Sequence, residues 1–202
     1  MTDRDLRPAS DADRPEIVST LAQAFAQDPV FRWMLPDEPV RLRHLPRLFD
    51  LLFGVERRRG LIVTAQDGGA ASFWRRPGEA GAPPADVLRN ALPLLGVFGG
   101  NIGRALAVSN AIEAHFPRDR RFWYAHFVGV RPDRQGKGWG GAMIRGGLAR
   151  AAVDGAPVYL ETARPENVRF YVGLGFEVTA EWDIPRGPHF WSMIHAGGTR
   201  PA

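Results

Sequence analysis

The sequence has no cysteine, a single lysine, and no unbroken apolar run of the length that spans a membrane. The absence of cysteine excludes disulfides, thiolate nucleophiles and zinc–thiolate sites. Residues 1–14 are charged and do not resemble a secretion signal, so we expect neither export nor membrane insertion. The composition therefore predicts a soluble, cytoplasmic protein.

Basic residues are dispersed along the chain, although they outnumber the acidic ones and give a net charge of +4. All but one of the 26 basic residues are arginine, and only Arg57–Arg59 form a run. Such a run is typical of a solvated helix end, where the helix dipole favours positive charge. We expect no nucleic-acid partner, because binding would need basic side chains gathered on one face. We also predict no metal site. Four of the five histidines lack acidic neighbours at metal-ligand spacing: His44, His115, His189 and His195.

The pattern of apolar residues predicts one α/β domain over residues 1–202, a length that suffices for a sizeable core. Extended patterns predict strands at residues 5–10, 61–65, 70–75, 121–130, 158–162, 176–184 and 189–195. Helical patterns predict helices at residues 14–27, 40–58, 139–153 and 166–173. Asp28-Pro29 is expected to end the first helix. Residues 86–115 are expected to form two or three helices broken at Pro93, Gly96 and Gly99-Gly100.

Residues 128–144 have the pattern of a strand, a glycine-rich turn and a helix start in immediate succession. Gly136, Gly138 and Gly140 leave the backbone N–H groups of the turn free of side-chain cover. A helix N-terminus also concentrates unpaired donors and partial positive charge, so the turn suits a diphosphate, with Arg134 and Lys137 as further cations. A tight turn before a helix is the alternative, because a glycine pattern alone is a weak signal.

Two motifs at matching separation carry a resemblance to a known superfamily. Residues 135–140, Gln-Gly-Lys-Gly-Trp-Gly, match an acetyl-CoA motif, and residues 160–176 contain Leu-Glu-Thr and Phe-Tyr-x-x-Leu-Gly-Phe. The sequence thus resembles the GCN5-related N-acetyltransferase (GNAT) superfamily. The second motif and the Pro-Arg-Gly-Pro-x-x-Trp-x-Met of residues 185–193 resemble its puromycin N-acetyltransferase branch. The resemblance covers residues 121–195 clearly and the N-terminal helices loosely.

The resemblance implies the GNAT fold, a mixed and mostly antiparallel twisted sheet of about seven strands flanked by helices, with an extra helical insertion around residues 84–116. It also implies acetyl-CoA as co-substrate, without a metal. Asn167 would hydrogen-bond the cofactor arm, and Tyr171 would protonate the leaving thiolate. The residues expected to bind the rest of the cofactor are Val128, Gly129, Val130, Gln135, Gly136, Lys137, Gly138, Trp139, Gly140 and Gly141.

Two residues are candidates for the general base that deprotonates an amine. Glu161 is the first, because a carboxylate inside an apolar strand is costly to bury unless it lies in a solvated cleft or is paired, for instance with Arg164. His126 is the second, because histidine titrates near neutral pH, although a buried core histidine is the plainer interpretation. Tyr124 shares the face of His126 by strand alternation and could relay protons.

The predicted reaction is direct attack of a small molecule's primary amine on the bound thioester, since the chain has no cysteine to carry the acyl group. Phe31, Trp33, Trp74 and Tyr124 are candidates for the wall of the acceptor pocket, and core packing is the alternative role of these aromatic residues. A non-catalytic acetyl-CoA-binding module and an enzyme that acetylates a protein amine are the alternative functions. Antibiotic resistance and a homodimer are compatible with the sequence, which does not identify the amine.

Overall fold

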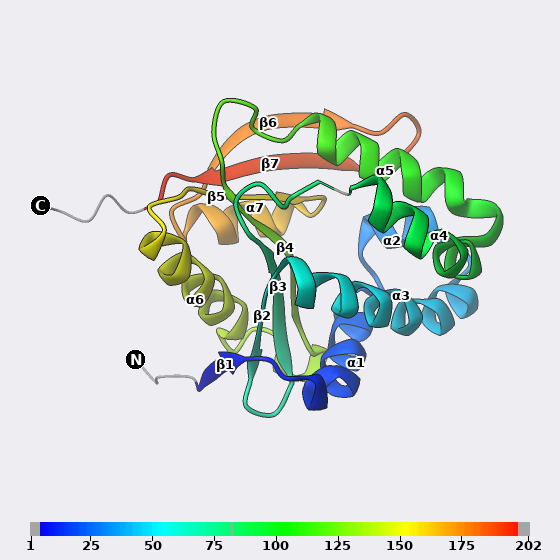
Figure 1. The fold of residues 1–202 in the computed structure, drawn as a ribbon, viewed down its shortest axis with the longest axis horizontal. Coiled ribbons are helices and arrows are strands. Elements are labelled where there is room, and N and C mark those ends of the chain that lie inside the picture. The colour runs from blue at the N-terminus through cyan, green and yellow to red at the C-terminus, as the bar shows by residue number, and fades with distance from the viewer. Residues whose placement is uncertain (1–4, 82, 198–202) are drawn as a thin grey trace, which may run out of the picture.

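A twisted sheet with helices on both faces forms the centre of the molecule (Figure 1). The computed structural model describes residues 5–81 and 83–197. Within them the strands are β1 (Leu6–Pro8), β2 (Gly60–Ala65), β3 (Ala70–Arg75), β4 (Trp123–Val130), β5 (Val158–Thr162), β6 (Glu177–Asp183) and β7 (His189–His195). Their order is β1-β2-β3-β4-β5-β7-β6, with β4 and β5 parallel and the other neighbours antiparallel. The predicted mixed, mostly antiparallel sheet is confirmed.

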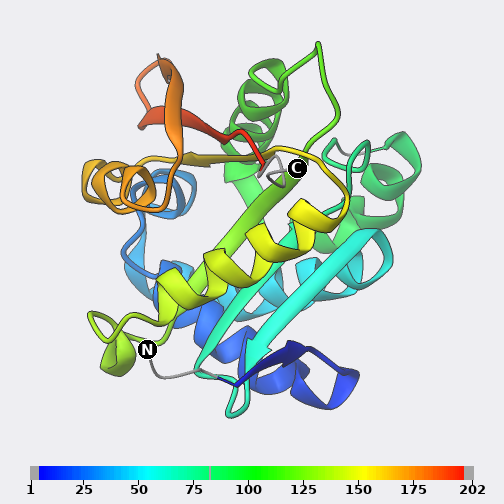
Figure 2. The same cartoon turned by 90° about the vertical axis from the view of Figure 1, so that its left-hand side faces the viewer.

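Helices cover both faces of the sheet. The helices are α1 (Arg14–Phe25), α2 (Pro29–Met34), α3 (Glu38–Arg59), α4 (Pro84–Phe98), α5 (Ile102–Ala114), α6 (Trp139–Val153) and α7 (Pro165–Val172). α6 crosses one face and packs on β2, β3 and β4, as Figure 2 shows. α1 and α3 pack on the other face, and the pair α4 and α5 is the predicted helical insertion between β3 and β4.

Each face of the sheet has its own apolar core. Phe73 and Trp74 are adjacent in β3 and both are fully buried, but their side chains belong to different cores because side chains alternate along a strand. Phe73 packs with α1 and α3 through residues such as Phe53. Trp74 packs beneath α6, where a Cβ at Gly147 would overlap its ring.

One prediction about helix breaks is incomplete and another is wrong in part. The pair Asp28-Pro29 starts α2 as well as separating it from α1, since Asp28 accepts a hydrogen bond from the N–H of Val30 at 2.9 Å and caps the new helix. In the insertion, Pro93 and Gly96 lie inside α4, which continues to Phe98. The chain turns only at Gly99, whose φ of +50° ends the helix.

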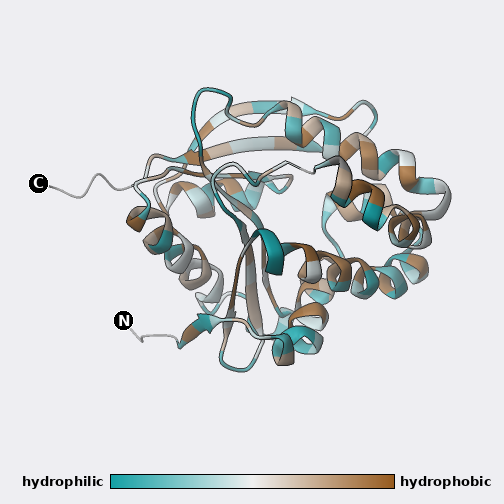
Figure 3. Cartoon of the chain, viewed as in Figure 1, coloured by the Kyte–Doolittle hydropathy of each residue, from teal (hydrophilic) through white to brown (hydrophobic). Residues whose placement is uncertain are grey.

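The insertion also carries exposed apolar side chains. Ala85–Ala114 is, among the described residues, long and apolar enough for a membrane span by length and composition, and 17% of its most apolar window is buried. The segment is two helices that meet at Gly99–Asn101, with α4 against α3 and α5 against α2. Figure 3 shows hydrophobic residues along both helices, and Leu88 and Leu92 are 79% and 81% exposed.

β4 and β5 separate soon after they meet. They pair at Trp123 with Val158 and at Tyr124 with Tyr159, and the remainder of β4 has no partner on that edge among the described strands. On its other edge β4 pairs with β3, with a register shift at Phe73/Trp74 that leaves His126 as the extra residue of a β-bulge. The free edge of β4 and the bulge together define the region of the candidate site.

Candidate active site

The glycine turn after β4 is shaped as an open cradle. Gly136 and Gly138 have φ values of +72° and +80°, which favour glycine, and a Cβ at Gly136 would meet no atom within 4 Å. Gln135 ties the turn to β4 by donating a hydrogen bond from its side-chain nitrogen to the carbonyl of Val130 at 3.0 Å. Gly138 is the N-cap of α6, so the free N–H groups of the first helical turn face this cradle.

The other predicted residues of the turn are held by neighbouring side chains or pack closely. Lys137 donates from Nζ to the carbonyl of Asp133 at 2.8 Å. The guanidinium of Arg134 lies 5.6 Å from the centre of the Trp139 ring. A Cβ at Gly140 would lie 3.5 Å from Phe170, and one at Gly141 would lie 3.1 Å from the Arg145 side chain.

The backbone of β4 alternates between its two edges. The N–H of Arg131 donates to the carbonyl of Gly69 at 3.0 Å, on the β3 side. Because successive residues of a strand direct their N–H groups to opposite edges, those of Val128 and Val130 point to the open edge. Packing requires glycine at position 129, because a Cβ there would lie 2.5 Å from Leu21 of α1. These positions agree with the predicted cofactor edge.

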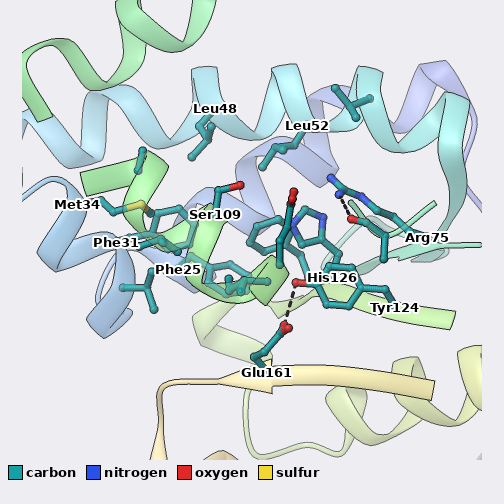
Figure 4. Close-up of a pocket in the computed structure, with 18 of the residues that line it drawn as sticks. Phe25, Phe31, Met34, Leu48, Leu52, Arg75, Ser109, Tyr124, His126 and Glu161 are labelled. Carbon is teal, nitrogen blue, oxygen red and sulfur yellow. Dashed lines mark hydrogen bonds between the residues drawn. The ribbon is translucent and has the colours of Figure 1, made fainter. Parts of the chain in front are cut away.

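A cavity of about 360 Å³ joins this edge to the helical side of the molecule. Its wall contains Val128, Asn167 and Tyr171, three residues of the predicted cofactor site. Its other walls come from α1 to α5 and are mostly apolar, with Phe25, Phe31, Met34, Leu48 and Leu52 among them (Figure 4). This volume and apolar lining are typical of a pocket for a small molecule.

Glu161 projects from β5 into the cavity and lies beside Tyr124 of β4 (Figure 4). Its Oε2 accepts a hydrogen bond from the Tyr124 hydroxyl at 2.9 Å, whereas Oε1 is buried and has no hydrogen-bond partner among the described residues. Burial raises the pKa of Glu161 to about 8. The alternative ion pair is not formed, because Arg164 lies 3.5 Å from Asp28 and 3.2 Å from Glu166.

His126 also lines the cavity, next to Tyr124. The two rings are stacked with centroids 5.0 Å apart, which confirms that they share a face. The His126 Nδ1 lies 2.9 Å from Oε1 of Glu56, and the same oxygen accepts hydrogen bonds from Nε and Nη2 of Arg75 at 2.9 and 2.7 Å. Burial and the charge of Arg75 lower the pKa of His126 to about 4, so the ring is neutral at pH 7.

Tyr171 and Asn167 lie where the cavity meets the edge of β4. Burial raises the pKa of Tyr171 above its ordinary value, with a smaller contribution from the negative charge of Asp28, so the phenol stays protonated. Asn167 donates a hydrogen bond from its side-chain amide to the hydroxyl of Thr162 at 3.2 Å. Both predicted residues are therefore in contact with the same cavity as Glu161.

Two of the four aromatic candidates for the acceptor wall line the cavity, and two do not. Phe31 and Tyr124 line it. Trp33 lies outside it, where its ring nitrogen donates to the carbonyl of Arg186 at 2.8 Å and its ring lies under the guanidinium of Arg104. Trp74 is buried beneath α6 on the opposite face, so the core-packing alternative describes its position.

Several polar residues of this region were not found from the sequence. Glu56 is fully buried near the end of α3, and Arg75 is buried at the end of β3. Arg59 belongs to the run for which the sequence predicts a solvated helix end, but it is 9% exposed, lines the cavity and lies 3.2 Å from Glu79. Glu56 and Arg59 belong to α3 and Arg75 belongs to β3, so no sequence spacing connects them with Tyr124 in β4 or Glu161 in β5.

Comparison with known proteins gives a consistent result. The acetyltransferase (GNAT) family matches residues 94–176. An uncharacterized N-acetyltransferase of Schizosaccharomyces pombe is 28% identical over 174 residues, which are 81% of this chain and 70% of that protein. A solved structure described as histone acetyltransferase HPA2 and related acetyltransferase, from Corynebacterium glutamicum, is 26% identical with a TM-score of 0.73, and the match covers 98% of this chain and 99% of that one.

A more distant structure shares the fold. Arylalkylamine N-acetyltransferase 2 from Aedes aegypti is 13% identical with a TM-score of 0.65, over 96% of this chain and 98% of that one. The mixed, mostly antiparallel sheet and the glycine turn before α6 agree with the fold expected from the sequence motifs. The fold, the family match and these relatives together support a place in the GNAT superfamily and identify the chain as an acetyltransferase.

Proposed function

We propose that the enzyme transfers an acetyl group from acetyl-CoA to the primary amine of a small molecule with an apolar body. The observation that carries this proposal is the position of Glu161. Glu161 places a carboxyl group from β5 in a mostly apolar cavity. Val128, Asn167 and Tyr171, on the proposed cofactor side, line the same cavity. An amine bound in the cavity would therefore meet a proton acceptor close to the acyl donor.

The residues of the cofactor side fit acetyl-CoA. The open cradle at Gly136 and the N–H groups at the start of α6 suit its diphosphate, and the open edge of β4 at Val128 and Val130 suits its amide-containing arm. When bound, acetyl-CoA supplies the activated acetyl group. An N–H of this strand edge would polarise the acetyl carbonyl, as in an oxyanion hole.

Two proton transfers follow from the side chains of the cavity. In its ionised form, Glu161 accepts one proton from the substrate ammonium, which leaves the amine with a free electron pair for attack. The hydrogen bond from Tyr124 keeps Oε2 oriented. The Tyr171 hydroxyl holds its proton at neutral pH and can donate it to the departing sulfur. The resulting tyrosinate can then accept the proton that the attacking nitrogen loses as it becomes an amide, so that the net proton released stays on Glu161.

The cavity favours an acceptor with an aromatic or other apolar body. Its size of about 360 Å³ and its Phe25, Phe31 and Leu48 side chains suit such a group better than a polycation. The Aedes aegypti structure of the same fold is named for arylalkylamines. A protein amine is less compatible with this cavity, because helices α1 to α5 supply its walls.

Puromycin is an acceptor that the sequence motifs suggest. We infer a relation to the puromycin N-acetyltransferase branch, and with it a role in resistance, from the motifs at residues 160–176 and 185–193. Puromycin is an amine with aromatic groups, so it agrees with the apolar lining of the cavity. Its acetylation is an outcome of the experiment below.

The experiment is a release assay for the free thiol of coenzyme A with a panel of amines. We expect turnover with 2-phenylethylamine, tryptamine or puromycin, and little turnover with spermidine or kanamycin. Activity restricted to the polycations would contradict the proposed acceptor class. Binding of acetyl-CoA without turnover of any amine or peptide N-terminus would favour the non-catalytic module.

The Tyr171→Phe variant tests the proposed acid. We expect turnover to fall by about 10- to 100-fold, because the departing sulfur loses its proton donor. The affinity for acetyl-CoA, measured by calorimetry, should stay within about twofold, since the ring itself is retained. Full turnover in this variant would remove Tyr171 from the mechanism.

A further inference from the structure

We propose that Glu56 is a positioning residue that acts through His126. It holds Nδ1 of the imidazole, so that Nε2 is presented to the cavity as a hydrogen-bond acceptor for the substrate amine. The role toward the amine rests on the proposed function, whereas the arrangement of the ring does not. No sequence motif connects the two residues, because Glu56 belongs to α3 and His126 belongs to β4.

The contacts of Glu56 all involve one oxygen. Its Oε1 accepts two hydrogen bonds from Arg75 and lies 2.9 Å from Nδ1 of His126, while Oε2 is buried and has no partner among the described residues. Leaving a buried carboxylate oxygen unpaired is costly, so the arrangement is not one that packing alone would favour. Glu56 does not line the cavity, whereas Arg75 and His126 do, so it can act on a ligand only through them.

The hydrogen bond fixes which ring nitrogen carries the proton. Arg75 keeps Glu56 ionised, and an ionised carboxylate can only accept hydrogen bonds. Nδ1 must therefore be the donor, and in a neutral imidazole the other nitrogen, Nε2, is then an acceptor. The charged partner thus selects the tautomer that leaves a lone pair in the cavity.

Packing fixes the direction of the ring. The bulge in β4 places His126 and Phe127 on the same face, with ring centroids 4.1 Å apart, and Tyr124 stacks on the imidazole at 5.0 Å. The His126 side chain is 16% exposed, and the hydrogen bond that its ring makes to Glu56 uses Nδ1 and leaves Nε2 for another partner. Figure 4 shows the ring beside Tyr124 and Arg75.

This geometry gives the two candidate bases different tasks. The substrate ammonium gives one proton to Glu161, and the resulting primary amine keeps two N–H groups and one lone pair. One N–H donates to Nε2 of His126, which orients the lone pair for attack on the acetyl carbonyl.

The first test reads the tautomer in the resting, full-length protein. Nitrogen-15 NMR of labelled wild-type protein at pH 7 distinguishes a protonated from an unprotonated ring nitrogen. We expect Nδ1 of His126 to be protonated and Nε2 to be unprotonated. A protonated Nε2 with a free Nδ1 would overturn the proposal, whatever the substrate is.

The second test is a double-mutant cycle with 2-phenylethylamine. We expect Glu56→Gln to lower kcat/KM at least fivefold, because a neutral amide can present either its oxygen or its NH2 group to Nδ1 and so holds the ring less uniquely. In a His126→Phe background the same substitution should change kcat/KM by less than twofold. Effects that multiply would show that Glu56 acts independently of His126. Glu38→Gln, at the exposed start of the same helix, is the matched control and should leave kcat/KM unchanged.

Two further measurements cover the failure of a variant or of the proposed function. If Glu56→Gln does not fold, His126→Gln and His126→Phe decide, because the glutamine oxygen can accept a hydrogen bond from the amine and the phenyl ring cannot. Equal losses in both would overturn the role toward the amine. If the wild-type protein turns over no amine, 2-phenylethylamine is titrated into it and the Nε2 resonance of His126 is monitored by NMR. An unchanged resonance then rejects that role, while the tautomer still decides the positioning of the ring.

Discussion

Glu56 and Glu161 are two buried carboxyl groups in one region, and their surroundings differ in a way that gives them opposite protonation states. Burial opposes ionisation of both. The hydrogen bond with His126 and the ion pair with Arg75 outweigh it at Glu56 and lower the pKa of that carboxyl group to about 2. At Glu161 the hydrogen bond from Tyr124 is insufficient, and burial raises the pKa to about 8.

The difference shows what decides the chemistry of a buried carboxyl group here. A cation within hydrogen-bonding distance keeps Glu56 charged, and a permanently charged group can orient a neighbour but cannot exchange protons near pH 7. A neutral hydroxyl partner leaves Glu161 close to its titration point, which suits proton exchange with an amine. Burial is common to both, so the partner distinguishes the two roles.

The largest expected effect is that of Glu161→Gln on turnover. Glutamine keeps the shape and the hydrogen bond with Tyr124 but cannot accept a proton, so we expect kcat/KM to fall by about 100- to 1000-fold. Steady-state kinetics measures this loss. Glu177→Gln, on the exposed face of β6, is the matched control and should remain within twofold of wild type. A loss below fivefold at Glu161 would remove the contrast between the two carboxyl groups.

The second effect concerns stability rather than turnover. Arg75→Met leaves the Glu56 charge without its cation, and we expect the free energy of unfolding to fall by about 3 kcal/mol. Urea denaturation measures the change. Arg150→Met removes an exposed pair, Arg150 with Asp154 at 3.4 Å, and should cost less than about 1 kcal/mol. Equal losses in both variants would indicate that the Glu56 pair is not a buried, charge-stabilised site.

The third effect is a dependence of kcat/KM on pH. Glu161 must be ionised to accept a proton, and its pKa of about 8 means that the active form increases from pH 7 to pH 9 by about tenfold. The profile should therefore rise through a step near pH 8, in addition to the rise from the amine itself. Glu161→Gln retains the amine's contribution and should lack the step. Persistence of the step in that variant would assign it to another group.

The smallest effect is that of Tyr124→Phe. The hydrogen bond from Tyr124 favours the ionised form of Glu161, so its loss should raise the pKa of Glu161 further. We expect kcat/KM at pH 7 to fall about threefold to fivefold and the step to move to higher pH, with activity regained above it. A step that moves to lower pH would contradict the role of this hydrogen bond.

The proposed cofactor side of the molecule was readable from the sequence because its signals are local. Gly138 and Gly155 bound α6, and the predicted helix from residue 139 to residue 153 is confirmed without change. β5 at residues 158–162 is likewise confirmed. In both cases the apolar pattern and the turn residues lie within a few positions of the element that they define.

The acceptor side was less readable because its contacts join distant parts of the chain. Glu56 lies next to the arginine run at the end of α3, where its burial and its pairing with Arg75 leave no trace in local composition. Trp74 and Phe31 have similar apolar character, and only the sheet shows that they belong to opposite faces. Asp28-Pro29 is both an end and a start signal, and the choice depended on packing of α2 in the core.

The bulge in β4 has a consequence for how such an enzyme can change over evolution. In a strand without a bulge, a register shift of one residue would turn every later side chain to the other face of the sheet. The extra residue at His126 absorbs such a shift before Val128. Insertions, deletions and substitutions around His126 can therefore remodel the acceptor wall while the backbone edge from Val128 to Val130 stays in register. A single strand can thus retain one ligand site and diversify the other.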